Sequence, residues 1–386
     1  MIRSERPAGR VDVAFFLLDL DGGGAERAVV SLAGEVAHRG YSVDLVVGDA
    51  DSDYRSEVSA AVNVENFGTR SAVRVFRGLM SYLRRRNPVV MMSALDVSNI
   101  MLVVATKLAG YRGRVVLSQR AVVGASWQDL GFVRRMLTAT LQRVCFPRAD
   151  ALISNSHAAA RDLNTMLGVR SDKIVTIHNS MDMERVARLA SERPPEHACL
   201  EDGVPLVVCV GSLTPRKDVP TVIRAFALVT RCRRAHLAIV GKGEEASCIL
   251  TLIKELGLEA NVHLLGFDAN PYKWMAASRV LVSASTGEGF PNVIAEGLAL
   301  GRSVVATDCP GDTAELLGHG KWGRLVPVGD HERMAEAILA ALDDPNPPDG
   351  CARAADFAPL KVTSTYLNVL LPSQPHSTPD TIRQLQ

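Results

Sequence analysis

Two glutamates eight positions apart are the residues whose types and spacing most clearly suggest chemistry in this chain. Glu288 and Glu296 occur in the stretch "STGEGFPNVIAEGLALGRSVVATD" (285–308), and Gly287 and Gly289 flank the first of them. Flanking glycines let a backbone turn sharply because they carry no Cβ. A strand-like run, "RVLVSAS" (279–285), leads into this turn, so we expect Glu288 at the carboxyl end of a strand.

The residues after Glu288 predict the start of a helix. Pro291 and Asn292 favour such a start, with Asn292 expected as the cap, and Gly301 is expected to end the helix. The free N–H groups of a helix start attract anions such as a nucleotide diphosphate. Glu288 would then accept hydrogen bonds from sugar hydroxyls beside that phosphate, and Glu296 from another pair of hydroxyls, such as those of a ribose. Taken alone, Glu296 is better explained as a carboxylate stabilised by the helix dipole, and only the Gly-Glu-Gly-Phe-Pro-Asn motif together with Lys217 favours the ligand role.

A basic pair occurs at the end of another strand-like run. In "VGSLTPRKDVPTVIRAF" (210–226), Arg216 and Lys217 lie in the turn between a strand and a helix that is expected to start near Pro220. Ligands of parallel sheets bind at the carboxyl ends of the strands, where a diphosphate needs cations. The pair therefore favours a diphosphate site, although two exposed basic residues in a loop would look the same.

The glycine-rich stretch "LLDLDGGGAER" (17–27) admits several interpretations. A dinucleotide fingerprint is excluded because Arg27 occupies the place of its third glycine. Asp19, Asp21 and Gly22 fit the D-x-D-G-T of a haloacid-dehalogenase-like phosphatase, although Gly23 replaces the Thr. Asp19 and Asp21 also fit the metal ligands of a metal-dependent glycosyltransferase. A loop that lets the backbone approach a phosphate and a plain strand-to-helix turn remain open as well.

Strand-like and helix-like segments alternate along the chain. The rhythm begins at 11–20, 24–40 and 41–49, stops in the polar stretch 187–203, and resumes with strand-like runs at 205–213, 235–243, 261–267, 279–285 and 303–308. Such alternation predicts parallel sheets. We therefore expect an α/β protein with two parallel-sheet domains, a linker near 187–203, and a polar, disordered tail at 372–386.

Composition favours a globular protein of a reducing compartment. Of the 386 residues, 47% are hydrophobic and 22% charged, which suits two domains. The seven cysteines include no C-x-x-C pair and the nine histidines no H-E-x-x-H, so neither a disulfide framework nor a metal site is expected. No leader-like segment opens the chain and charges interrupt every long apolar run. We expect a cytoplasmic protein without a membrane-spanning helix.

Charge is distributed unevenly although the net charge is only +1. Residues 1–190 carry 25 basic and 19 acidic side chains, and residues 71–148 carry 13 basic side chains against two acidic ones. The segment "RVFRGLMSYLRRRNP" (74–88) combines arginines with apolar residues, which suits an anionic membrane surface, a phosphate-bearing substrate or a solvated helix face. No motif for nucleic-acid binding is present, and nucleic acid is not expected as a partner.

These motifs together resemble the retaining GT-B glycosyltransferases of family 4. The resemblance rests on Glu288…Glu296 within "GEGFPNVIAEGLALGRSVVATD", on "GGAERAVVSLA", on "IHNSMD" (177–182) and on "VGSLTPRKD", and it covers residues from about 11 to 370. It implies two Rossmann-like domains that face each other across a cleft: an acceptor-binding domain at 1–190 and a nucleotide-sugar-binding domain at 200–355. A crossover helix at 356–371 would return to the first domain, ahead of the tail at 372–386.

The resemblance also implies a role for individual residues. The catalytic residues would be Glu288, Lys217 and Arg216. Lys217, with Arg216, would contact the donor diphosphate, and Glu288 the donor sugar. Glu296 would hold the ribose. The nucleotide-binding residues would be Gly23, Gly24, Gly211, Gly289, Phe290, Pro291, Asn292 and Glu296. No metal and no cofactor is implied, because the nucleotide sugar is itself a substrate.

Two positions depart from the family pattern. Family members often carry Arg after the glycine of the second-half motif, where this chain has Ser212, and Arg216 is expected to compensate. Many also carry a histidine after the strand near 115–119, where this chain has Gln119 and Arg120.

The expected activity is transfer of a hexose or N-acetylhexosamine with retention, from a nucleotide sugar to a lipid-linked or surface-glycan acceptor. The Phe-Pro-Asn variant resembles members that use UDP-sugars, while GDP-mannose stays open. The protein would lie on the inner face of the cell membrane. A catalytically silent GT-B subunit that binds a nucleotide or partner and a phosphatase built on Asp19 and Asp21 are the alternatives.

Overall fold

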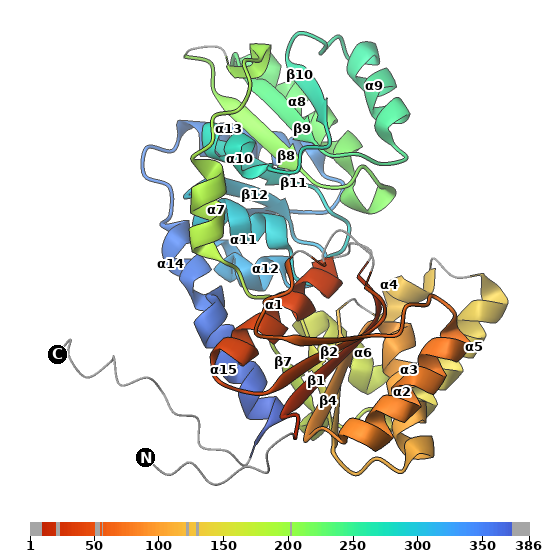
Figure 1. Cartoon of the computed structure of the whole chain (residues 1–386). Coiled ribbons are helices and arrows are strands. Elements are labelled where there is room, and N and C mark those ends of the chain that lie inside the picture. The colour runs from red at the N-terminus through yellow and green to blue at the C-terminus, as the bar shows by residue number, and fades with distance from the viewer. Residues whose placement is uncertain are drawn as a thin grey trace. The chain divides into compact units, whose positions relative to one another are not determined.

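The computed structural model describes residues 10–20, 24–50, 55, 57–120, 123–128, 131–200 and 203–372. Strands and helices alternate within these residues and form two parallel sheets with helices packed on them (Figure 1). Apolar runs form the central strands, such as β4 (Val90–Ala94) and β9 (His236–Val240), which are buried on both faces as parallel strands between helices are.

The first sheet has the strand order β3-β2-β1-β4-β5-β6-β7. Its strands are β1 (Val13–Asp19), β2 (Val43–Asp49), β3 (Asn63–Asn66), β4 (Val90–Ala94), β5 (Arg114–Gln119), β6 (Ala151–Ser154) and β7 (Ile174–Thr176). The helices along this part of the chain are α1 (Gly24–His38), α2 (Ala72–Arg86), α3 (Asp96–Ala109), α4 (Val123–Gln128), α5 (Phe132–Cys145), α6 (His157–Thr165) and α7 (Met183–Ala190).

The second sheet repeats this pattern with the order β10-β9-β8-β11-β12-β13. Its strands are β8 (Leu206–Val210), β9 (His236–Val240), β10 (Val262–Gly266), β11 (Val280–Ser283), β12 (Ser303–Thr307) and β13 (Arg324–Val326). The helices are α8 (Val219–Cys232), α9 (Ala246–Glu255), α10 (Tyr272–Ala277), α11 (Asn292–Ala299), α12 (Thr313–Leu316), α13 (His331–Asp343), α14 (Gly350–Ala354) and α15 (Pro359–Leu370).

In each sheet the chain first adds strands on one side of its first strand, β1 or β8, and then adds the later strands on the other side. This is the Rossmann-like pattern expected from the sequence. In the second sheet the reversal falls between β8 and β11, which pair in parallel through Val207 and Val280. Doubly wound sheets bind ligands at such a switch point, outside the carboxyl ends of the strands. A ligand site is therefore expected at the turns that follow β8 and β11.

Each face of the second sheet has its own core. Val207 and Cys209 pack with Phe226 on one face, whereas Val208 packs with Leu298 on the other. Successive side chains of a strand point to opposite faces, so the same short run supplies both cores. The two cores hold β8 and β11 rigidly, and with them the turns at their ends.

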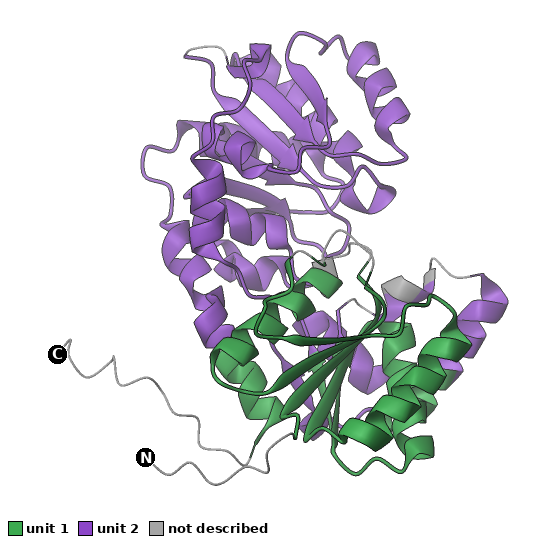
Figure 2. Cartoon of the chain, viewed as in Figure 1, with its two compact units in different colours: residues 1–118, 141–153, 363–386 green, residues 119–140, 154–362 purple. Residues whose placement is uncertain are grey.

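Contacts divide the chain into two compact units, shown in Figure 2. One comprises residues 1–118, 141–153 and 363–386, and the other residues 119–140 and 154–362. Helix α15 starts in the second unit and continues into the first, where Arg114 Nε donates to the Val369 carbonyl at 3.0 Å and Arg39 Nη1 to Ser364 Oγ at 2.9 Å. A C-terminal helix that returns to the first sheet was expected, and α15 is that helix.

The domain boundaries expected near 190–200 and 355 remain predictions. The polar linker differs from its expectation at one end, because helix α7 continues to Ala190. From residue 373 on, the tail expected to be disordered lies outside the described residues. Among the helices described, none is both long and apolar enough to cross a bilayer.

Candidate functional site

The carboxylate of Glu288 is buried at the switch point of the second sheet. Only 9% of the residue is exposed, in the turn between β11 and α11. Arg216 Nη1 donates to its Oε2 at 3.0 Å, and Ser285 Oγ donates to its Oε1 at 2.8 Å. Lys217 Nζ also donates to Oε1. Two cations from the turn after β8 thus share one carboxylate from the turn after β11.

These cations keep Glu288 ionised. Burial by itself raises the pKa of Glu288, but the charge and hydrogen bond of Lys217, with further help from Arg216 and Ser285, outweigh it. The net result is a pKa below the ordinary value of 4.5. The site therefore presents a carboxylate with two cations at neutral pH.

Main-chain contacts connect the two turns. The Thr286 N–H donates to the Arg216 carbonyl at 2.8 Å, and Arg216 Nη1 donates to the Gly287 carbonyl at 3.0 Å. Lys217 ends a short 3-10 turn, after which Asp218 starts α8 and accepts from the Thr221 hydroxyl at 2.7 Å. Arg216 and Lys217 are thereby aimed at Glu288 by local structure at both ends of their loop.

Close backbone approach explains two glycines beside the site. A Cβ on Gly311, whose φ is +135°, would lie 1.7 Å from the Glu288 carbonyl oxygen. A Cβ on Gly241 would lie 1.8 Å from the Gly211 carbonyl oxygen. Only glycine fits at either place. Gly211 itself lines a pocket of about 10 Å³ with Ser212 and Lys217, room for one water.

Glu296 lies in the second turn of α11 and is held from a neighbouring helix. The Tyr272 hydroxyl of α10 donates to Glu296 Oε1 at 3.0 Å. Tyr272 is buried, and nothing in the sequence near either residue marks the pair because 24 positions separate them. The contact gives Glu296 a preferred direction rather than a free position on the helix surface.

The helix start after Glu288 differs from its expectation. Asn292 does not cap α11: the N-cap position is Pro291, without a side-chain cap, and Asn292 is the first helical residue. The Asn292 N–H donates to the Phe290 carbonyl at 3.0 Å, while its side-chain oxygen accepts from Asn179 Nδ2 at 3.0 Å. Asn292 fails as a cap because its side chain is engaged by a residue 113 positions away.

Phe290, expected to contribute a main-chain amide, also anchors the turn through its ring. The ring is buried and lies 5.1 Å from that of Phe357 and 5.3 Å from that of His178. Gly289 beside it faces Asn155, whose Nδ2 would be 3.2 Å from a Cβ at that position. Aromatic packing and a glycine contact therefore hold the loop that carries Glu288.

Several residues that contact one another near the loop carrying Glu288 could not be recognised as partners from the sequence. Arg120 Nη1 donates to Asn179 Oδ1 at 2.9 Å, and Asn155 Nδ2 donates to the Arg120 carbonyl at 3.0 Å. Among the residues that the structure describes, Asn155 Oδ1 and Arg120 Nε have no hydrogen-bond partner, although both atoms are buried. Asn179 belongs to "IHNSMD" and Arg120 stands where a histidine was expected. Arg120 thus takes part in the network that leads to Asn292.

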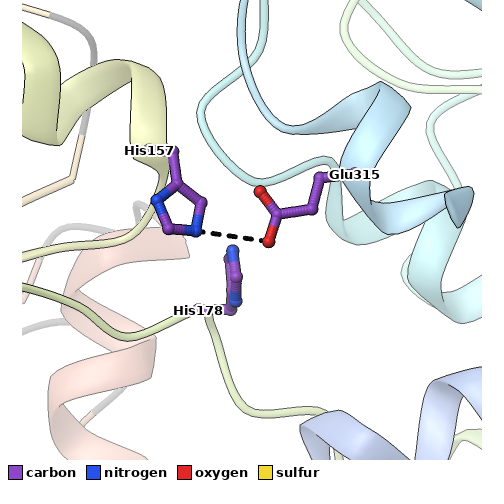
Figure 3. A group of neighbouring side chains, drawn as sticks. All are labelled: His157, His178 and Glu315. Carbon is purple, nitrogen blue, oxygen red and sulfur yellow. Dashed lines mark ion pairs between the residues drawn. The ribbon is translucent and has the colours of Figure 1, made fainter. Parts of the chain in front are cut away.

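A group of imidazole and carboxylate donors lies next to Phe290. His157 Nε2 is 3.2 Å from Glu315 Oε1, and His178 is close to both, as Figure 3 shows. Asp312 accepts from His178 Nε2 at 2.9 Å and from the His157 N–H. The donor atoms of His157, His178 and Glu315 lie within 4.8 Å of one another, so this group could bind a transition metal. The hydrogen bonds and the half-exposed His157 and Glu315 equally suit a polar network that fastens α6 to α12.

The glycine-rich loop of the first unit is described only in part. Gly23, Asp21 and Gly22 lie outside the described residues, and Gly24 is the first residue of α1. Asp19 ends β1, in register with Asp49 of β2. The roles proposed for Gly23 and Gly24 stay predictions.

Two family models match consecutive parts of the chain. Residues 22–185 match the model described as Glycosyltransferase Family 4, and residues 204–344 match the model described as Glycosyl transferases group 1. The first range contains "GGAERAVVSLA" and "IHNSMD"; the second contains Lys217, Glu288 and Glu296.

Two curated relatives illustrate the range of similarity. The N-acetylgalactosamine-N,N'-diacetylbacillosaminyl-diphospho-undecaprenol 4-alpha-N-acetylgalactosaminyltransferase of Campylobacter jejuni is 32% identical over 238 residues, which are 62% of this chain and 63% of that protein. The match thus spans just under two thirds of that relative's length. The lipopolysaccharide core biosynthesis glycosyltransferase LpsE of Rhizobium meliloti is 26% identical over 358 residues, 90% of this chain and 96% of that protein.

Solved structures share the whole fold. HepE of Anabaena in complex with UDP has a TM-score of 0.76 and 20% identity, over 93% of this chain and 99% of that chain. Both domain models occur in the order of the two sheets, and the fold agrees along the same length. The chain therefore belongs to the GT-B glycosyltransferases, with a family 4 domain followed by a group 1 glycosyl transferase domain.

Proposed function

We propose that the protein is a retaining glycosyltransferase that moves a hexose or N-acetylhexosamine from a nucleotide sugar to a lipid-linked or surface-glycan acceptor. The observation that supports this most is the ionised carboxylate of Glu288, buried with Lys217 and Arg216 at the switch point of the second sheet. UDP is the favoured nucleotide, with GDP-mannose as the second candidate. The structure of HepE with UDP and the Phe-Pro-Asn variant support UDP.

The chemistry needs positive charge where the diphosphate departs. Transfer breaks the bond between the anomeric carbon and a diphosphate oxygen and forms a bond to the acceptor oxygen, whose proton passes to the departing diphosphate. Lys217, Arg216 and the N-terminus of α11 would stabilise the charge that develops on that oxygen. Because both cations already lie beside Glu288, a sugar held by Glu288 would be adjacent to its own diphosphate. No metal is assigned in this proposal.

The nucleotide would extend from the diphosphate toward α11. Glu296, positioned by Tyr272, would accept hydrogen bonds from the two ribose hydroxyls. The main chain at Gly211, Gly289, Phe290 and Asn292 would line the phosphates; Pro291 has no N–H to donate. Gly23 and Gly24 would also bind the phosphate, as the resemblance in the sequence implies.

The proposed acceptor and location draw on the relatives. The Campylobacter jejuni relative is named for a diphospho-undecaprenol acceptor and LpsE for lipopolysaccharide core synthesis. We propose an acceptor of this kind and a cytoplasmic protein attached peripherally to the inner face of the cell membrane. The excess of basic side chains in residues 71–148 supports an anionic membrane as partner.

A donor panel tests the proposal. The protein would be incubated with UDP- and GDP-activated sugars and with lipid-diphosphate acceptors, and the anomeric configuration of the product would be read by NMR. Transfer with retention from one donor is expected. Binding of a nucleotide without transfer or hydrolysis from any donor would instead favour the silent subunit. The similarity to glycosyltransferases does not favour a phosphatase. That alternative would require a phosphatase activity that is lost in Asp19→Asn.

The role of Lys217 can be measured without knowing the acceptor. Lys217→Ala should weaken binding of the nucleoside diphosphate by about 1.5–3 kcal/mol, the scale of a charge-assisted hydrogen bond, and leave free nucleoside nearly unaffected. Calorimetry with UDP and uridine reads both values. Lys254→Ala on α9, far along the chain from the turn after β8, serves as the matched control. Equal losses for UDP and uridine would place Lys217 away from the diphosphate.

A further inference from the structure

Three side chains that can bind a metal ion meet at one place in the second compact unit. His157 is the first residue of α6, His178 lies in the turn between β7 and α7, and Glu315 belongs to α12. Their donor atoms all lie within 4.8 Å of one another. A ring nitrogen of His178 points toward the contact between the other two side chains (Figure 3). We call these three side chains the imidazole–carboxylate group.

The spacing of the imidazole–carboxylate group suits a single ion. With bonds of about 2.0–2.2 Å, two ligands of a tetrahedral zinc ion lie about 3.3–3.6 Å apart. The 3.2 Å between His157 Nε2 and Glu315 Oε1 is close to that separation. The longer separations within the group can close by rotation of these two side chains, because they are 50% and 40% exposed. The backbone therefore does not have to move for all three to reach one ion.

The carboxylate of Asp312 contacts both histidines of the group. It accepts from His178 Nε2 at 2.9 Å and from the His157 N–H at 2.9 Å. Only 2% of Asp312 is exposed. Carboxylates of this kind orient metal-binding histidines and are part of most such sites. Asp312 and Glu315 together would also balance the charge of a divalent cation held by two neutral imidazoles, so that no buried charge is left uncompensated.

The donor set indicates the class of metal. Two imidazoles with one carboxylate suit Zn²⁺ and the similar divalent transition metals, whereas Mg²⁺ and Ca²⁺ prefer ligands that are all oxygen. The rings of Phe290 and Phe357 lie 5.3 and 5.6 Å from the ring of His178 and border it with apolar surface. The exposed side chains of His157 and Glu315 leave the group accessible to solvent. Water would complete the coordination of an ion there.

We propose that the imidazole–carboxylate group binds one Zn²⁺ or similar divalent transition-metal ion, with Asp312 as its supporting carboxylate. The bound ion would connect α6, the turn before α7 and α12, which are far apart in the sequence. It would therefore stabilise the folded chain, because the unfolded chain does not hold these three ligands together.

The metal would act on the turn of Glu288 without taking part in transfer. The Asp312 N–H donates to the Gly289 carbonyl at 3.2 Å, so the supporting carboxylate belongs to a residue that also holds this turn. Glu288 and Lys217 are not among the proposed ligands. The inference is therefore independent of the proposed function, and metal binding is measured without a nucleotide sugar.

Cobalt titration tests the site, because the visible absorption of bound Co²⁺ reports the geometry of its ligands. The full chain is freed of metal with a chelator and then titrated. Wild type should take up one Co²⁺ per chain, and Zn²⁺ should displace it. His157→Gln and Glu315→Gln should each weaken binding by more than about a hundredfold because a ligand is lost, and Asp312→Asn by about ten- to a hundredfold. His331→Gln, on α13, is the matched control and should bind as wild type.

Thermal unfolding provides a second measurement. Zn²⁺ should raise the midpoint of unfolding of wild type and of His331→Gln, but not that of His157→Gln, and Mg²⁺ should raise none of them. Because His157 and Glu315 are half exposed, their substitution should leave the fold intact, which circular dichroism checks. A group that is only a polar network would instead give the same response to Zn²⁺ in wild type and in the ligand variants.

Three outcomes would overturn the proposal. They are the absence of a Co²⁺ spectrum in wild type, unchanged affinity in both His157→Gln and Glu315→Gln, and absorption from sulfur-to-cobalt charge transfer. The last would assign the ion to a cysteine, such as the exposed Cys232 or Cys248. Transfer is assayed separately: transfer without a metal site contradicts this inference alone, and a metal site without transfer contradicts the proposed function alone.

Discussion

At the scale of single residues, the candidate site is a carboxylate made to stay charged in a buried place. Glu288 accepts from Lys217, Arg216 and Ser285 together, and their contacts outweigh the cost of burial. An ion pair of this kind at the ends of two strands is poorly explained as a surface salt bridge, because Glu288 and Lys217 are mostly withdrawn from water. It is well suited to hold polar groups in place before a reaction.

Removing this charge should damage both activity and stability. Glu288→Gln is expected to lower transfer about 10²–10³-fold, the scale of losing one preorganised polar contact in the transition state. It should also lower the free energy of unfolding by on the order of 1–3 kcal/mol, because Lys217 loses its partner in a partly buried place. Steady-state kinetics and denaturant titration measure the two effects. Wild-type turnover in the folded variant would remove Glu288 from the mechanism.

At the scale of elements, turns between strands and helices decide where the site residues point. The Gly311 backbone contacts the Glu288 carbonyl, and the Glu288 N–H donates to the Pro310 carbonyl at 3.0 Å. The turn after β12 therefore supports the turn after β11. Position, rather than residue type alone, makes Glu288 available to a ligand.

A pair of glycine variants separates this support from backbone strain in general. Gly311→Ala should abolish most activity and cost more than about 1 kcal/mol of stability, since its Cβ must displace the Glu288 main chain. Gly329→Ala also has a positive φ, +76°, but its Cβ meets open space. That variant should lose stability through backbone strain but keep its activity. Thermal unfolding measures the first effect and steady-state kinetics the second. Full activity in Gly311→Ala would contradict the proposed support.

Strands β9 and β10 are joined by a histidine pair that predicts a pH effect. His263 Nε2 lies 3.1 Å from His236 Nδ1, with the His197 ring 5.0 Å from that of His263. Burial, and then the neighbouring histidines His236 and His197, lower the pKa of His263 to about 4 from the ordinary 6.5. The unfolded chain takes up this proton first on acidification, so stability is complete above pH 6.5 and is lost as the pH falls toward 4.

Substituting this histidine should flatten that pH dependence. In His263→Asn, unfolding free energy measured by denaturant titration should fall less between pH 7 and pH 5 than in the wild type. The pair lies on strands away from the turns that carry Lys217 and Glu288, so nucleotide affinity at pH 7.5 should be unchanged. An undiminished slope in the variant would show that other groups cause the acid sensitivity.

At the scale of the whole molecule, the candidate site around Glu288 and a second buried polar network belong to different compact units. Lys217, Glu288 and Glu296 all belong to the second compact unit. The first unit contains a separate buried network, in which the Tyr82 hydroxyl donates to Asp44 Oδ2 at 2.8 Å and Asn63 Nδ2 to Asp44 Oδ1 at 3.0 Å. Burial, followed by the charge of Asp44, raises the pKa of Tyr82 and keeps it a donor.

This separation predicts a variant that loses stability but keeps its ligand. Tyr82→Phe should cost about 0.5–1.5 kcal/mol in denaturant titration, because Asp44 retains Arg86 and Asn63 after the hydroxyl is removed. Its affinity for UDP, measured by calorimetry, should equal that of the wild type. Weakened UDP binding would mean that the network of the first unit contributes to the site.

Much of the fold and part of the site were predictable because their signals are local. A short run such as "AHLAIVGKG" predicts a strand followed by a glycine turn. The repeated alternation of strands and helices predicts two parallel sheets. The same local signals predicted that Glu288 and Lys217 follow the ends of strands, and the structure confirms it, with Glu288 after β11 and Lys217 after β8. Asn292 shows the limit, because a good cap by residue type was engaged elsewhere by Asn179.

The sequence by itself determined the order of elements, the two-sheet architecture and the motif residues, since periodicity and turn chemistry act over a few neighbours. Only the tertiary structure decided that Arg216 and Lys217 meet one carboxylate more than 70 positions away, and that Tyr272 directs Glu296. It alone also decided that Phe132 and Val133 of α5 are exposed to solvent. Burial and ion pairing depend on which distant segments become neighbours, and no short stretch of chain carries that information.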